Sequence, residues 1–404
     1  MFTITETSAP LAALFFKDPR VTDVIRVVGF NFLFTIPSLI SNTLLIKKLQ
    51  FKALVLIRSS SALLQSALAV YLVLSTNLRY WCLVIPMLIA ILFEEVTIFI
   101  VVGWRPKFLF DKQSFKYLFR YGINGLGFSI TNYLHQNIDY LLVGRLLGSM
   151  SLGLYQFAYQ IPHLILDRFA RPVGSVVFPA LSKVQDSDER LIAGYIKAAK
   201  YIALGAFPAL GGLAVLADLI VTVLWGEKWL PIVTPLRILC LCAAVRCVVT
   251  PIGSIFLCKQ RPDINFKFGV ATFLLTMTAV ATLGPLYGLN GVASGMLIST
   301  LSYLYIINLA FKMTAFTPVK LSSALWAPTA ATGISMMCAY GVRYLLASGG
   351  APSWIALVCS VASGAIGYIA WLFVIFRPTV VEVTKTAHTV IGGRASKTGI
   401  RNVA

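Results

Sequence analysis

The chain has 404 residues, of which 58% are hydrophobic and only 12% charged, and its mean hydropathy is +0.82. Soluble domains carry about 25% charged residues, so this composition excludes an ordinary soluble domain and indicates a polytopic helical membrane protein. The net charge of +19 is dispersed over many connections, which favours membrane topology and contact with anionic membrane lipids over binding of nucleic acid.

The apolar segments predict an all-α fold with about eleven membrane spans. A span needs about 20 mostly apolar residues. Short connections join the predicted spans, and no soluble domain is inserted between them. In chain order they cover 21–45, 54–76, 81–103, 121–143, 153–178, 201–225, 232–258, 266–286, 289–311, 323–346 and 354–376.

The basic residues predict how the spans are oriented. Of the 34 Lys and Arg residues, 23 fall in one set of alternate connections and five in the other. The side rich in basic residues is expected to be cytoplasmic. This places the C-terminus and its basic tail in the cytoplasm, and the N-terminus outside.

A weak internal repeat predicts the organisation of the chain. The segment from Lys17 to Lys48 parallels the segment from Glu227 to Arg261, at an offset of roughly 211 to 214 residues. Both copies run in the same direction across the membrane, as in a parallel repeat. Spans 1–3 then match spans 7–9, and the partners of spans 4–6 are absent, so we expect a chain that lacks about three N-terminal helices. The predicted parts are a three-helix lobe remnant at 1–119, a six-helix lobe at 120–321, two additional helices at 322–376 and a disordered tail at 377–404.

A polar stripe interrupts the apolar span at 153–178. It consists of Gln156, Gln160, His163, Asp167 and Arg171, spaced by four, three, four and four residues. This spacing puts all five on one face of a helix. An ionisable residue at the bilayer centre costs about 2.5 to 3.5 kcal/mol, so the stripe must face other protein or a water-filled cavity. The sequence therefore predicts a polar lumen inside the membrane.

Several ordered blocks of sequence resemble a known transporter family. The blocks comprise 132–134, 137–148, 152–155, 158–159, 177–186, 226–229, 235–239, 251–254 and 259–263. They are similar to the Wzx-type polysaccharide flippases, in particular the WzxC-like branch of the superfamily that also holds the MATE exporters and the lipid II flippase MurJ. The resemblance implies a two-lobed bundle, here with an incomplete N-terminal lobe, in the bacterial cytoplasmic membrane.

The resemblance also implies a substrate and partners. The substrate would be an undecaprenyl-diphosphate-linked oligosaccharide, moved to the outer leaflet by alternating access for exopolysaccharide, capsule or lipopolysaccharide synthesis. A polysaccharide polymerase and the chain-length machinery are further partners that it suggests. We expect no cofactor and no covalent chemistry.

The basic residues of the stripe region are candidates for binding the diphosphate. Guanidinium groups bind phosphate oxygens bidentately, so Arg168 and Arg171 would contact the diphosphate or the sugar. The alternative is that Arg171 pairs with Asp167 and holds the bundle together.

A second polar stripe lies on the span at 121–143. It consists of Asn132, His135 or Gln136, and Asp139. These side chains suit sugar hydroxyls, or a proton relay if His135 and Asp139 titrate. Asp139 is equally suited to orienting the turn at Gly144 and Arg145.

Two arginines of the seventh predicted span cannot both face one lumen. Arg237 and Arg246 are nine residues apart, which is about 180° on a straight helix. Arg237, Arg246 and Arg26, the repeat mate of Arg237, are candidates for substrate contact. Arg237 and Arg26 are alternatively suited to reaching back to the membrane surface.

Two adjacent acids lie about 14 Å deep in the third predicted span at 1.5 Å per residue. Glu94 and Glu95 are candidates for a coupling-ion site, or for pairing with an arginine of another helix.

The sequence gives less support to two other functions. A MATE-like cation-coupled exporter of small molecules favours an acidic lumen, whereas arginine outnumbers acid within these spans. A membrane glycosyltransferase or polymerase needs a long outer loop, and the longest outer connection between predicted spans is under a dozen residues. The seven cysteines and three histidines show no metal-binding spacing, and no ATP-binding motif is present.

Overall fold

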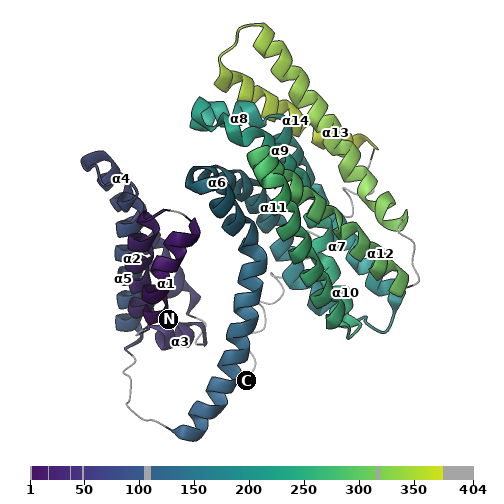
Figure 1. Cartoon of the computed structure of the whole chain (residues 1–404). Coiled ribbons are helices and arrows are strands. Elements are labelled where there is room, and N and C mark those ends of the chain that lie inside the picture. Colours follow the sequence, from purple (N-terminus) through teal and green to yellow (C-terminus); the bar gives the residue numbers. More distant parts are fainter. Residues whose placement is uncertain are drawn as a thin grey trace, which may run out of the picture. The chain divides into compact units, whose positions relative to one another are not determined.

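The computed structural model describes residues 2–16, 18–36, 38–47, 50–103, 111–314 and 319–375. Every regular element in these ranges is a helix (Figure 1), which confirms the predicted all-α class. The chain divides into two compact units, Met1–Ile130 and Thr131–Ala404. The four-part organisation proposed from the sequence stays a prediction, and the predicted tail at 377–404 lies outside the described residues.

The first unit is built from five helices and the beginning of a sixth. Helix α2 packs against α1 and α5, and α4 packs against α5. The helices are α1 (Phe2–Phe16), α2 (Arg20–Thr35), α3 (Leu39–Lys47), α4 (Phe51–Ser75), α5 (Trp81–Val102) and the start of α6 (Lys112–Ser182).

The second unit contains the rest of α6 and all later helices. Helix α7 packs against α9 and α13, α11 against α9, and α13 against α14. Its helices are α7 (Asp188–Val215), α8 (Ala217–Trp225), η1 (Glu227–Ile232), α9 (Val233–Val249), η2 (Thr250–Ile252), α10 (Gly253–Cys258), α11 (Pro262–Leu301), α12 (Tyr303–Met313), α13 (Val319–Ser348) and α14 (Ser353–Ile375).

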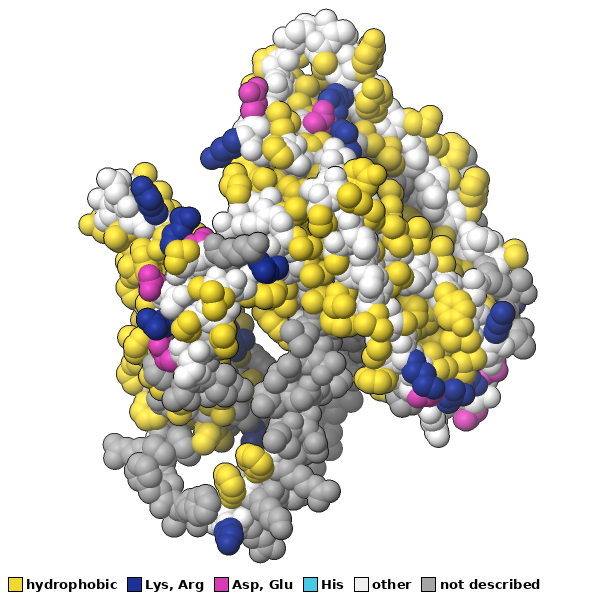
Figure 2. All heavy atoms as spheres, in the orientation of Figure 1, with side chains coloured by type: hydrophobic (Ala, Val, Ile, Leu, Met, Phe, Trp, Pro, Cys, Tyr) yellow, Lys and Arg dark blue, Asp and Glu magenta, His cyan; other side chains and the backbone are white. Residues whose placement is uncertain are grey.

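The surface of the second unit fits a lipid environment. Large apolar side chains such as Leu286, Met337 and Val374 are 71 to 75% exposed. In the face shown, apolar side chains cover the middle of the unit and charged side chains gather towards its ends (Figure 2). This distribution matches a hydrocarbon core between two polar interfaces, and the chain is a multi-pass membrane protein.

Six helices of the described residues are long and apolar enough to cross a membrane, or seven if α2 and α3 form one broken span. One of these stretches, Asp263–Met313, has 51 residues, more than twice the length that one span needs. The count of eleven spans stays a prediction.

Glycines create the reversals inside the two longest helices. Gly148 has φ 83° and ψ 175° within α6, and Gly288 has φ 59° and ψ −139° within α11. Only glycine adopts such angles without a steric penalty. Each long helix is therefore two arms, and the breaks fall between the predicted spans 121–143 and 153–178, and between 266–286 and 289–311.

The helix that begins at Val233 is interrupted near its end. Helix α9 stops at Val249, the 3₁₀ turn η2 covers Thr250–Ile252, and α10 continues from Gly253. Pro251 has no N–H to donate to the preceding turn. Side chains satisfy two neighbouring carbonyls: the Thr250 hydroxyl donates to the Arg246 carbonyl at 2.7 Å, and the Tyr195 hydroxyl of α7 donates to the Val248 carbonyl at 3.2 Å.

We predict that Gly148→Ala lowers the free energy of unfolding by about 1 to 3 kcal/mol, the usual cost of a strained backbone conformation. A Cβ at this position meets no atom within 4 Å, so the loss comes from the backbone alone. Gly153→Ala is the control, because Gly153 has helical dihedrals and equally open space. Thermal unfolding in detergent measures both, and equal stabilities of the two variants would contradict the backbone argument.

Candidate functional site

A polar cavity of about 620 Å³ lies within the second unit. Both arms of α6, together with α9, α10, α11 and α12, form its walls. Its volume is typical of small-molecule sites, which range from about 300 to 1,000 Å³. The polar or aromatic side chains that line it are Asn137, Asp139, Tyr140, Gln156, Tyr159, Gln160, His163, Arg246, Thr250, Asn265, Phe268, Thr272, Thr276, Ser299, Thr300 and Tyr303.

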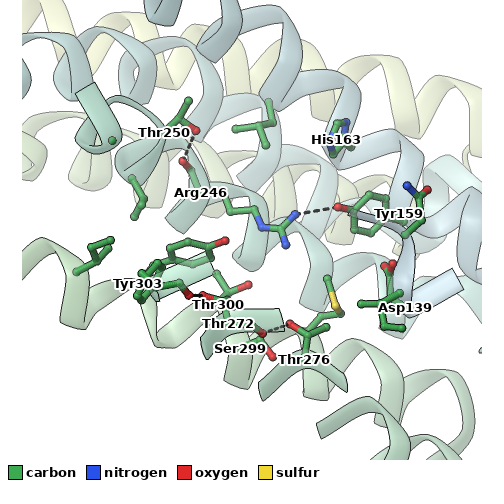
Figure 3. A pocket seen from close by; sticks show the side chains of 18 of the residues that line it. Asp139, Tyr159, His163, Arg246, Thr250, Thr272, Thr276, Ser299, Thr300 and Tyr303 are labelled. Atoms are coloured by element: carbon green, nitrogen blue, oxygen red, sulfur yellow. Dashed lines mark hydrogen bonds between the residues drawn. The ribbon is translucent and has the colours of Figure 1, made fainter. Parts of the chain in front are cut away.

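Arg246 is the cationic centre of this cavity. Its Nη1 donates a hydrogen bond to the Tyr159 hydroxyl at 2.8 Å, and the two side chains point toward one another (Figure 3). Its Nε is buried and has no hydrogen-bond partner in the protein. Arg246 forms no ion pair within 4.0 Å with a carboxylate of the described residues. A guanidinium has five N–H donors, so the Nη N–H groups that do not bond Tyr159 are left for a ligand.

Arg246 also lies deep in the membrane-spanning stretch. It is 12 residues from the Cys258 end of the apolar stretch Glu227–Cys258, which is about 18 Å at the rise of an α-helix. A cation at this depth is expensive unless it faces protein or a polar cavity. Its position on the cavity wall meets that requirement.

Asp139 is held by a cluster of tyrosines. Its side chain is only 3% exposed, and its Oδ2 accepts a hydrogen bond from the Tyr155 hydroxyl at 2.8 Å. The rings of Tyr140, Tyr155 and Tyr159 have centroids 5.7 to 6.0 Å apart, and the Tyr159 ring stacks on His163 at 5.4 Å. The two arms of α6 are therefore joined by rings and by a buried hydroxyl–carboxylate bond.

A wall of hydroxyl groups belongs to the two arms of α11 and the start of α12. Thr272, Thr276, Ser299 and Thr300 gather there beside Tyr303 (Figure 3). The Thr276 hydroxyl donates to the Thr272 carbonyl at 2.8 Å, and the Ser299 hydroxyl donates to the Gly295 carbonyl at 3.0 Å. Each oxygen keeps acceptor capacity after this bond, so the wall can accept hydrogen bonds from a polyhydroxylated ligand.

The structure brings together five of the residues proposed from the sequence and places others elsewhere. Asp167 and Arg168 are not part of the cavity lining, and His163 Nδ1 lies 3.3 Å from Asp167 Oδ2. The side chains of Asn132, His135 and Arg171 lie outside the described ones, so the Asp167–Arg171 pair stays a prediction. The residues that do line the cavity are Asp139, Gln156, Gln160, His163 and Arg246, with Asn137 and Gly253 from the family-like blocks beside them.

Arg237 is engaged in a charge cluster away from the cavity. Its Nη2 lies 3.1 Å from Asp218 Oδ1, and its Nε donates to the Ala214 carbonyl at 3.1 Å. Arg343 of α13 donates to both carboxylate oxygens of the same Asp218. Arg237 and Arg246 thus face different surroundings, as their nine-residue separation predicts. Arg237 links α9 to α8 through its ion pair with Asp218.

The acids and the arginine proposed in the first unit also have partners there. Arg58 Nε lies 3.4 Å from Glu94 Oε1, and the Ser38 hydroxyl donates to the Glu95 carboxylate. Arg26 Nε lies 3.7 Å from Glu6 Oε2. The pairing of Glu94 with an arginine of another helix is the alternative that the sequence left open, and the coupling-ion role stays a prediction.

A comparison with protein families identifies the chain. Residues 1–234 match the model of a family described as polysaccharide biosynthesis protein. The chain belongs to this family.

Two relatives and one solved structure extend the comparison. The chain is 28% identical over 386 residues to the teichuronic acid biosynthesis protein TuaB of Bacillus subtilis (strain 168), covering 91% of this chain and 77% of TuaB. It is 29% identical over 303 residues to the lipopolysaccharide biosynthesis protein WzxC of Escherichia coli (strain K12), covering 72% of this chain and 61% of WzxC. By their names, both relatives take part in biosynthesis, TuaB in that of teichuronic acid and WzxC in that of lipopolysaccharide.

The fold of this family member is similar to that of a lipid flippase. The solved structure of the lipid II flippase MurJ in an inward closed conformation superimposes with a TM-score of 0.72 and 18% identity, covering 89% of this chain and 75% of MurJ. This likeness confirms the MurJ-like helical fold implied by the sequence blocks.

We predict that Tyr155→Phe lowers the free energy of unfolding by about 1 to 3 kcal/mol, because it removes the side chain that donates a hydrogen bond to the buried Asp139 carboxylate. Tyr140→Phe is the matched control: its ring makes the same edge contacts, and its hydroxyl makes no hydrogen bond to another described side chain. Denaturation in detergent measures both. An equally small effect of the two changes would contradict the role given to the Tyr155 hydroxyl.

Proposed function

We propose that this chain moves a polyprenyl-diphosphate-linked oligosaccharide repeat unit across the bacterial cytoplasmic membrane, for exopolysaccharide, capsule or lipopolysaccharide synthesis. The observation that carries the proposal is Arg246, a membrane-buried cation with most of its donors unused, in the cavity of a member of the polysaccharide biosynthesis family. The names of TuaB and WzxC and the fold shared with a lipid II flippase support it.

The chemistry of the cavity suits the two polar parts of such a substrate. Arg246 can give charge-assisted hydrogen bonds to phosphate oxygens, and the planar guanidinium matches phosphate geometry. The hydroxyl wall of α11 and the amides of Gln156, Gln160 and Asn265 suit sugar hydroxyls. The apolar polyprenyl chain needs no polar site, because it can stay in the hydrocarbon.

The proposed activity is transport without covalent chemistry. The ligand would enter the cavity from the cytoplasmic leaflet and leave to the outer one as the protein alternates between two open states. Such a cycle needs binding groups near the middle of the membrane, where Arg246 lies. It breaks no bond in the substrate, so we infer that the protein is a transporter and not an enzyme.

We predict that Arg246→Gln lowers transport about 10- to 100-fold, the loss expected for removing a charge-assisted hydrogen bond worth about 1.5 to 3 kcal/mol. Arg246→Lys keeps the charge but not the forked geometry and should retain part of the activity. The measurement is restoration of surface polysaccharide, with the cellular pool of lipid-linked repeat units, in a strain that lacks its own flippase and expresses the gene product containing this chain.

Arg237→Gln is the matched control for this experiment. It makes the same change of charge on the same helix but lies in the Asp218 cluster, where Arg343 still pairs with the acid. We expect less than about a threefold loss of transport when compared at equal membrane abundance, since Arg237 does not line the cavity and Arg343 still neutralises Asp218. Equal losses for the two variants would remove Arg246 from the substrate site, and drug efflux without polysaccharide restoration would favour a small-molecule exporter instead.

The proposed orientation places the C-terminus in the cytoplasm. We predict that Met150→Cys, at a side chain 75% exposed beside the Gly148 break, reacts with a membrane-impermeant maleimide in intact cells. Gln185→Cys, at an exposed position beyond the other end of the same arm, should react only after the membrane is opened. Both are tested in a background with the seven native cysteines replaced. Labelling of Gln185→Cys in intact cells would overturn the orientation.

A further inference from the structure

A second cavity, of about 410 Å³, lies between α7 and α13 in the second unit. It shares no lining residue with the cavity around Arg246. Six of its lining residues belong to α7 and two to α13, and the two helices pack against each other (Figure 1). The lining consists of Glu189, Ile192, Ala193, Ile196, Lys197, Lys200, Lys320 and Ala324.

The charged side chains of this cavity are mostly basic. Among the residues that line it, Lys197, Lys200 and Lys320 are basic and Glu189 is acidic. Lys197 and Lys200 lie one turn apart on α7, and the packing of α13 on α7 brings Lys320 to them from 120 residues further along the chain. Lys197 Nζ also lies 5.7 Å from the centre of the Tyr201 ring, within the range of a cation–π contact.

The remaining lining is apolar. Ala193 and Ile196 stand on the same face of α7 as Lys200, at helical spacing, and Ala324 lies one turn after Lys320 on α13. A ligand that fills this cavity therefore meets an apolar wall and a cationic rim. Such a combination fits an amphiphile better than a free inorganic anion.

The position of the lysines in the predicted topology adds a third argument. Each lies within four residues of the start of a predicted span, 201–225 for Lys197 and Lys200, and 323–346 for Lys320. Both spans are predicted to start at the cytoplasmic surface. This surface carries the anionic lipids, and basic pockets between membrane helices on this side bind anionic headgroups.

We propose that the cavity between α7 and α13 binds the headgroup of an anionic phospholipid, with the acyl chains continuing along the apolar surface of the two helices. The lysines supply the charge complement of the phosphodiester, and Ala193, Ile196 and Ala324 contact the glycerol and upper chain region. The bound lipid would join α13 to the six-helix part of the chain at its cytoplasmic end.

The test is native mass spectrometry of the purified full chain in detergent with equal amounts of phosphatidylglycerol and phosphatidylcholine. The triple change Lys197→Gln/Lys200→Gln/Lys320→Gln should weaken retention of phosphatidylglycerol about 10-fold or more, since each basic residue adds to the affinity for an anionic headgroup. The control is Lys52→Gln/Lys183→Gln/Lys312→Gln, which removes the same charge from exposed lysines predicted on the same side and outside the cavity. It should change retention less than twofold.

A second variant keeps the test decisive if the triple change fails to fold. Ala193→Phe fills the apolar wall at an exposed position without altering charge, and it should also reduce retention of phosphatidylglycerol. Unchanged retention in the variants, or an equal loss in the lysine control, would overturn the proposal. So would displacement of the lipid by millimolar inorganic phosphate alone, because the site would then recognise a free anion.

Discussion

The cost of placing an ionisable group in hydrocarbon governs how this protein arranges its polar residues. Each such group must be paired, or it must face a polar cavity. Glu94 and Arg237 have partners from other helices, whereas Arg246 is left on a cavity wall with a single hydrogen bond to the protein. The exception marks the proposed binding site, because a buried cation without a carboxylate partner among the described residues is costly unless it serves a function.

Much of the site follows from helical periodicity. Gln156, Gln160 and His163 line the cavity as their spacing predicts, and the reversal at Gly148 falls between two predicted spans. The alternation of Arg237 and Arg246 between two surroundings follows from the same geometry. These features depend only on the periodicity of a single helix, and the spacing of residues in the sequence determines that periodicity fully.

Other features depend on which helices become neighbours, and spacing alone does not contain that information. Asp218 is joined by Arg237 and Arg343, the latter 125 residues away. The hydroxyl wall is not predicted by the sequence analysis. The hydroxyls of Thr272, Thr276 and Ser299 donate hydrogen bonds to carbonyls of their own helix, and these residues barely lower the mean hydropathy of a span. The sequence pattern that could have predicted this wall is a pair of polar side chains spaced by four residues on each arm, Thr272 with Thr276 and Ser299 with Tyr303.

The interruption after Val249 has a mechanical consequence. An uninterrupted helix resists bending because each turn would have to give up backbone hydrogen bonds, which water cannot replace inside a bilayer. Here Pro251 already lacks one bond, and hydroxyls from Thr250 and Tyr195 hold neighbouring carbonyls. Side-chain hydroxyls can pivot about their own bonds while the two helical segments change angle. We therefore expect this joint to bend more readily than an uninterrupted helix. It lies about one turn from Arg246, so a small rotation about it would change the direction in which the guanidinium points.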